Sequence, residues 1–173
     1  MSTQLFTNAH IATGMPSSPA ADTAAIQDIL VEDGKFVSIA PNLKATLEAQ
    51  GQDRASVEVI DLGGKLVCPP FCDTHLHLDY VFTARKPGAV NESGTLFEGI
   101  QRWSETKADL TVDEIKERAK IGIAKEMRHG VQFIRSHADV TDPNLTSLKA
   151  LLELKEELKD TVTLQIVSFP QEG

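Results

Sequence analysis

The sequence has little of what marks secreted, membrane or nucleic-acid-binding proteins. Its 173 residues include two cysteines, one tryptophan and one tyrosine, and no apolar run approaches the roughly 20 residues that cross a bilayer. The formal net charge is −8, without a basic cluster, so we expect neither nucleic acid nor an anionic membrane as partner. The N-terminus lacks the pattern of a signal peptide, and we therefore expect a cytoplasmic protein.

The cysteine content also excludes a disulfide framework. Cys68 and Cys72 lie on one extended segment, where a bridge between them would be geometrically awkward. They lack the paired CxxC spacing of a thiolate zinc site. We expect both thiols to be reduced and buried.

What the sequence does contain is a pair of histidines at a spacing that suits a metal ion. His75 and His77 follow a short apolar run at 66–71, and alternate residues of a strand point to the same face. Neutral imidazole is a good ligand for zinc and for iron, so the two rings can share one divalent ion. Two ligands are fewer than such an ion usually has, and a pair of this kind can also be ordinary core or surface histidines.

The residues before this pair resemble a small β domain. The segments expected to be extended are 5–13, 26–40, 57–62 and 65–71. Within the second of them, Asp33-Gly34 separates two apolar runs and predicts a hairpin. A loop is expected at 15–24 and a short helix or connection at 42–54.

Helical and extended patterns alternate after His77. Residues 95–109 predict a helix, with Trp103 and Phe97 as core candidates, and the loop before it either lines an active site or is a solvated insertion. Thr111 and Glu114 form a capping-box pattern that opens a second helix.

That second helix is expected to end at Gly130. The following run, 131–140, alternates strictly and predicts a strand with Arg135, His137 and Asp139 on one face. Asp142-Pro143 predicts a third helix with proline at its first position, and a last strand is expected at 161–170. Helical crossovers of this kind imply parallel strands.

The expected fold class is therefore α/β. A small N-terminal β segment, sandwich-like, is predicted at 1–66, and the first three β/α units of a TIM-type (β/α)8 barrel at 67–173. Such a barrel needs on the order of 250 residues, so we expect a truncated barrel in the N-terminal part of a longer protein.

Four segments carry a family resemblance that runs from about Asp61 to the last residue. They are PPFCDTHLHLD, SGTLFEGIQRW, SHADV and LQIVSFPQEG. In this order and spacing they resemble the amidohydrolase superfamily and, within it, the cytosine deaminase family.

The resemblance implies a metal-dependent hydrolytic deaminase that converts a free pyrimidine base, cytosine, and water to uracil and ammonia. One divalent metal ion, iron or zinc, would be bound in part by His75 and His77. Gln171 matches the family's substrate-binding glutamine, and its amide can both donate and accept hydrogen bonds. The remaining ligands and the catalytic glutamate lie on later strands of that family, so no catalytic residue is expected within this chain.

Several alternatives stay open on the sequence alone. His137 either hydrogen-bonds a metal ligand or a metal-bound water, or is a buried histidine bonded to Asp139 or to backbone. Asp73 and Asp79 either orient the imidazoles or serve as solvated or capping residues.

The substrate can also be a triazine, creatinine or isocytosine, and a non-catalytic, barrel-like assembly module is a further interpretation. The full-length enzyme can form a homo-oligomer. The 173-residue chain by itself is expected neither to turn over cytosine nor to hold metal tightly.

Overall fold

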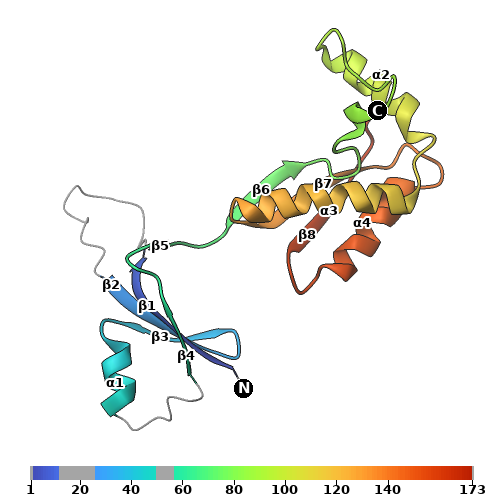
Figure 1. Ribbon diagram of the computed structural model, residues 1–173. Coiled ribbons are helices and arrows are strands. Elements are labelled where there is room, and N and C mark those ends of the chain that lie inside the picture. The colour runs from blue at the N-terminus through green and yellow to red at the C-terminus, as the bar shows by residue number, and fades with distance from the viewer. Residues whose placement is uncertain (1, 12–25, 50–56, 173) are drawn as a thin grey trace. The chain divides into compact units, whose positions relative to one another are not determined.

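The computed structural model describes residues 2–11, 26–49 and 57–172. The chain divides into two compact units, Met1–Pro69 and Pro70–Gly173 (Figure 1). The predicted loop at 15–24 lies outside the described residues. Among those residues, no helix has the length and apolar character needed to span a membrane.

The first unit is built around one mixed sheet. Its strands are β1 (Thr3–Ile11), β2 (Ile26–Glu32), β3 (Lys35–Ala40), β4 (Val57–Asp61) and β5 (Leu66–Val67). The order is β3-β2-β1-β4, with β5 also paired to β1. The β2–β3 hairpin is confirmed. Its turn residues Asp33 and Gly34 have φ values of 49° and 76°, as a type I′ turn requires.

A short helix packs against β1 and β2 of this sheet. Leu43 of α1 (Leu43–Ala49) packs with Leu5 and Leu30 in a small apolar cluster. The described residues of this unit form a single sheet, so the sandwich-like second layer stays a prediction.

The second unit is a three-stranded sheet with helical crossovers. Its strands are β6 (Phe71–Leu76), β7 (Val131–Asp139) and β8 (Thr163–Phe169), and its helices are α2 (Leu96–Lys107), α3 (Val112–Arg128) and α4 (Thr146–Glu157), with a short 3-10 turn η2 (Thr83–Arg85). The order is β6-β7-β8, and both pairings are parallel. The predicted alternation of strands and helices is confirmed, while the truncated barrel stays a prediction.

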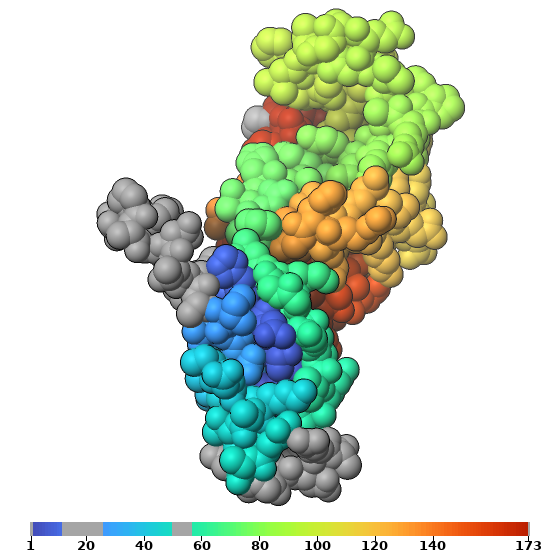
Figure 2. All heavy atoms as spheres, turned by 60° about the vertical axis from the view of Figure 1, so that its left-hand side comes forward, coloured from blue at the N-terminus to red at the C-terminus, as the bar shows by residue number. Residues whose placement is uncertain are grey.

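The core of this unit lies between the sheet and two helices. Helices α3 and α4 contact each other and β7, and they lie together against the strands in Figure 1. Their fully buried Ile115 and Leu151 pack with Ile134 and Leu164 of the sheet. The remaining segment, from the end of β6 through α2, gathers at one end of the unit beside the C-terminal residues (Figure 2, green to yellow-green beside red).

The helix boundaries follow local hydrogen bonding. Thr111 Oγ1 accepts the Glu114 N–H (3.3 Å), which caps α3 as expected. Helix α4 begins at Thr146 and not at Pro143, so the predicted proline at its first position is wrong. Asp142 accepts hydrogen bonds from the N–H groups of Asn144 and Thr146, and these bonds hold Pro143 in a turn before the helix.

Two burial predictions need correction. Cys68 and Cys72 are both free thiols, but both are exposed. Trp103 is buried as expected, whereas Phe97, on the same helix, is 84% exposed. Helical spacing alone could not separate these two residues, because the burial of Trp103 comes from its bond to Asp139 and its ring contact with Tyr80, both distant in sequence.

Candidate metal centre

His75 lies on β6 and His77 follows directly after this strand, which begins later than predicted. The strand runs Phe71–Leu76, so the apolar run at 66–71 mostly precedes it. Asp73 and Leu76 are three residues apart, yet they pair with Ile134 and Ser136 of β7, which are two apart. One extra residue on β6 is a β-bulge.

The bulge has a local cause and a clear consequence. Asp73 Oδ1 accepts the His75 N–H at 2.9 Å, and this side-chain bond replaces a bond of the strand ladder. Leu76 packs against the apolar core. Its neighbours His75 and His77 therefore point to the opposite, open face of the sheet.

Three imidazoles meet on that face. The third is His137 of β7, whose ring stacks on His75 with centroids 4.1 Å apart. The His77 centroid lies 5.3 Å from that of His75 and 5.5 Å from that of His137. One ring nitrogen from each residue lies within 4.8 Å of the other two. Phe169 of β8 contacts both His77 and His137 edge-on.

This geometry fits a metal ion. Nitrogens that share a tetrahedral ion at about 2.1 Å are about 3.4 Å apart, and the three ring nitrogens, within 4.8 Å of one another, are near that spacing. Among the described residues, His137 Nδ1 is a buried polar atom without a hydrogen-bond partner. A buried nitrogen of this kind needs a ligand or a water molecule to satisfy it.

Electrostatics favour the neutral imidazoles that bind metals. Burial lowers the pKa of His77, and repulsion from His137 and His75 lowers it further. A metal ligand must be deprotonated, so a lowered pKa makes His77 available over a wider pH range.

The segment that follows β6 is fixed by bonds from β7 and α3. The buried Leu78 N–H donates to Ser136 Oγ at 3.0 Å. The Asp139 N–H donates to Asp79 Oδ2 at 2.8 Å, and Arg118 donates to the Asp79 carbonyl at 3.1 Å. Asp79 is fully buried, and burial raises its pKa to about 6. Its carboxylate ties two strand ends together.

A hollow of about 580 Å³ lies beside the cluster. Tyr80 connects the two, because its ring stacks on His77 with centroids 4.8 Å apart and also lines the hollow. Trp103 and Thr106 of α2 and Gln171 of the turn after β8 form other parts of the wall. The hollow is large enough for a small heterocycle.

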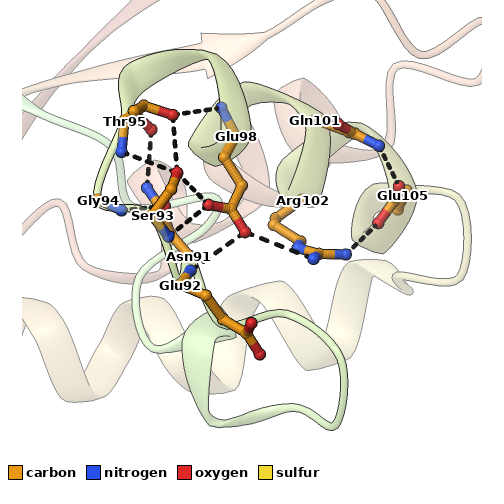
Figure 3. A network of polar contacts seen from close by, with 9 residues as sticks. All are labelled: Asn91, Glu92, Ser93, Gly94, Thr95, Glu98, Gln101, Arg102 and Glu105. Carbon is orange, nitrogen blue, oxygen red and sulfur yellow. Dashed lines mark hydrogen bonds and ion pairs between the residues drawn. The ribbon is translucent and has the colours of Figure 1, made fainter.

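The loop before α2, which forms one rim of the hollow, is held by its own hydrogen bonds (Figure 3). The Glu98 carboxylate accepts from the N–H of Glu92 (3.1 Å) and of Ser93 (2.6 Å), and from the Ser93 hydroxyl. Asn91 Oδ1 accepts the Gly94 N–H at 2.9 Å. These bonds fix the conformation of the loop, although residues 91–95 are exposed, so its role in lining a site stays a prediction.

A second network lies under the hollow and centres on Asp139, which is 2% exposed. Its carboxylate accepts from Trp103 Nε1 (2.6 Å), Lys107 Nζ (3.1 Å) and the Thr141 N–H (2.8 Å). Burial by itself would raise the pKa of Asp139, but the hydrogen bonds from Thr141, Trp103 and Lys107 outweigh it and lower that pKa. Asp139 is thus a buried, ionised carboxylate that is stabilised by hydrogen bonds and by the positive charge of Lys107.

The structure brings His75 and His77 together as the sequence indicated, and it adds His137. Strict alternation in 131–140 already places the His137 side chain on a defined face. Its position beside His75 follows from the register of two parallel strands, which the sequence does not specify. Gln171 lies in the wall of the neighbouring hollow.

The comparisons with known proteins agree with this arrangement. A sequence profile of the Amidohydrolase family matches residues 58–173. The chain therefore belongs to the amidohydrolase family, whose members are metal-dependent.

Two curated relatives and one solved structure illustrate the likeness. N-isopropylammelide isopropyl amidohydrolase of Pseudomonas sp. (strain ADP) is 30% identical over 152 residues, which cover 86% of this chain and 36% of that protein. Pterin deaminase of Rhizobium rhizogenes (strain K84 / ATCC BAA-868) is 26% identical over 159 residues, 89% of this chain and 34% of that protein. The chain thus spans about a third of the length of these relatives.

The solved structure is 5-methylcytosine deaminase from Klebsiella pneumoniae, liganded with 5-fluorocytosine. It is 39% identical, the match covers 98% of this chain and 37% of that chain, and the TM-score is 0.79.

Proposed function

We propose that this chain forms the metal-binding and base-binding part of a hydrolytic deaminase that acts on a free pyrimidine base, cytosine plus water giving uracil plus ammonia. The observation that carries the proposal is the cluster of three imidazoles, with ring nitrogens within 4.8 Å of one another, next to a hollow lined by Gln171.

The roles of the residues follow from their chemistry. His75 and His77 would hold one divalent ion, iron or zinc, because imidazole suits both, and His137 completes the cluster. When bound, such an ion makes hydroxide available near neutral pH by acidifying water. The further ligands and the catalytic acid are expected outside residues 1–173.

Gln171 would recognise the base. Its amide carries a donor and an acceptor side by side, which matches the ring carbonyl and adjacent nitrogen of a pyrimidine. Tyr80 and Trp103 give the same hollow apolar, aromatic walls, as a flat ring requires. The likeness to 5-methylcytosine deaminase, at 39% identity, supports a pyrimidine as the substrate.

A second candidate is an amidohydrolase of the same branch that acts on a triazine. The 30% identity to N-isopropylammelide isopropyl amidohydrolase favours it, because pocket residues can change substrate without disturbing the histidines. Both candidates differ from a non-catalytic assembly module, and the retained histidine cluster argues against that module.

Ammonia release by the full-length protein tests the proposal. Cytosine, 5-methylcytosine, isocytosine, creatinine and a triazine would be compared at equal concentration. We expect the highest kcat/KM with cytosine or its 5-methyl derivative. Highest activity with the triazine would favour the second candidate, and ammonia from none of these compounds would contradict a deaminase of this class.

Two glutamine variants test the role of Gln171. In Gln171→Leu the KM for cytosine should rise by about tenfold or more, because a lost hydrogen bond in a desolvated site costs about 1–3 kcal/mol. Gln132→Leu, at an exposed position of β7, is the matched control and should leave KM unchanged. Equal KM values in the two variants would remove Gln171 from the site.

A further inference from the structure

One lysine connects both walls of the hollow. Lys107, in the last turn of α2, donates from Nζ to Asp139 Oδ2 (3.1 Å), to Thr141 Oγ1 and to Glu172 Oε1 (2.6 Å). These three bonds use all three donors of the ammonium group. The Lys107 side chain is 12% exposed, so the bonds are shielded from solvent.

The partners of Lys107 belong to different elements. Asp139 ends β7, and Glu172 lies in the turn after β8. Glu172 is the immediate neighbour of Gln171, which lines the hollow, and Trp103 and Thr106 line it from α2, within about one turn of Lys107. The Lys107 ammonium thus fixes α2 to β7 and, together with a hydrogen bond between the Ser104 and Glu172 side chains, fixes the Gln171 turn to α2.

Asp139, to which Lys107 is bonded, is held firmly in place. Asp139 is 2% exposed and keeps Trp103 Nε1 and the Thr141 N–H as further donors, so its carboxylate has little freedom to move. The Glu172 side chain, in contrast, is 39% exposed. Without the ammonium group, the turn after β8 would lose this ion pair to the α2 wall.

We propose that Lys107 is a positioning residue for Gln171: anchored on Asp139, it holds Glu172 and thereby sets where the Gln171 amide lies in the hollow. The proposal rests on the proposed function, since it gives Gln171 the role of base recognition. Lys107 is not among the residues that line the hollow. Its effect on the reaction is through the placement of Gln171, which should appear in KM more than in kcat.

The variants follow from the geometry. Lys107→Met removes the charge, Lys107→Arg keeps it, and Glu172→Ala releases the turn while leaving the bond from Lys107 to Asp139 in place. Lys116→Met is the matched control. The Lys116 side chain is 14% exposed and also bonds two carboxylates, Glu153 and Glu157, but it joins α3 to α4, away from Gln171.

Two measurements on the full-length protein are independent of turnover. The first is the rate of backbone amide hydrogen exchange at Gln171 and Glu172. The second is the NMR chemical shift of the indole N–H of Trp103, the single tryptophan of residues 1–173. In Lys107→Met and Glu172→Ala we expect exchange at the turn to be about tenfold faster or more. The indole resonance should shift in Lys107→Met and stay in place in Glu172→Ala, because only the first variant changes the donors to Asp139.

Kinetics with the preferred base complete the test. KM should rise by about tenfold in Lys107→Met and in Glu172→Ala, with kcat within about threefold of wild type. Lys107→Arg keeps the charge that pairs with Glu172 and should raise KM less than Lys107→Met does. Lys116→Met should change neither exchange at the turn nor KM. Unchanged exchange in Glu172→Ala, or equal effects in Lys107→Met and Lys116→Met, would overturn the proposal. Failure of the proposed function would instead show as absent ammonia release by the wild type.

Discussion

The bond between Leu78 and Ser136 holds the residue that directly follows His77. Strand β6 ends at Leu76, so His77 lies just beyond the strand ladder. The next residue, Leu78, is 0% exposed, and its N–H donates to Ser136 Oγ at 3.0 Å. In Ser136→Ala that N–H loses its acceptor in a site that is closed to water.

The expected cost can be worked from this geometry. A buried donor left without a partner costs about 1–3 kcal/mol, so the free energy of unfolding should fall by that amount. If the segment relaxes instead, His77 moves away from the cluster, and the same energy appears as a loss of metal affinity. At 1.4 kcal/mol for each factor of ten, that loss is about 5- to 140-fold, a range that includes the roughly 10- to 100-fold effect typical of contacts that orient a metal ligand without touching the ion.

Two assays on the full-length protein measure these effects. Urea unfolding followed by circular dichroism gives the change in stability, and competition with a chelator gives the change in metal affinity. Ser147→Ala, a substitution at another buried serine, in α4, is the control and should leave metal affinity unchanged. If Ser136→Ala keeps both wild-type stability and wild-type metal affinity, the reasoning about how His77 is held is wrong.

Two other predictions concern the fold around the site. The hydrogen bonds from the Ser93 hydroxyl and from the N–H groups of Ser93 and Glu92 lower the pKa of Glu98 from 4.5 to about 2. The ionised carboxylate therefore stabilises the fold above its unfolded pKa, and this stabilisation is lost as the pH falls from about 4.5 to 2. The difference in urea midpoint between wild type and Glu98→Gln should therefore be present at pH 7 and shrink at pH 3, and a difference that is equal at both pH values would contradict the account. Ile115→Ala removes a fully buried side chain from the core and should cost about 2–5 kcal/mol of unfolding free energy. Ile121→Ala, on the same helix at a side chain that is 52% exposed, should cost less than about 1 kcal/mol, and similar losses in both variants would show that the described core is wrong.

Much of the second unit could be predicted from sequence, because residues that are buried on one face of a strand or helix recur at regular intervals along the chain. The strict alternation of 131–140 identified β7, since Ile134, Ser136 and Ala138 are buried on one face. The Thr111 cap determined the start of α3 for a similar local reason. Pro143 misled the prediction of α4, because the Asp142 side chain forms a turn that competes with the helix.

The sequence indicated two residues of the candidate site but not how the site is assembled. The spacing of His75 and His77 indicated that they share a face, but the bulge caused by Asp73 and the position of His137 depend on the register between two strands. The connection of Lys107 to Glu172 joins residues 65 positions apart. No local pattern encodes such a contact, because it arises only when α2 and β8 are brought to the same end of the sheet.

The central claim is that His75 and His77 hold a divalent ion, and metal content tests it most directly. Elemental analysis after exhaustive dialysis would compare full-length wild type with His75→Ala, His77→Ala and His129→Ala, the last being an exposed histidine at the end of α3. We predict one iron or zinc ion per chain in wild type and His129→Ala, and loss of that ion in the other two variants. Full metal content in His75→Ala and His77→Ala would contradict the claim.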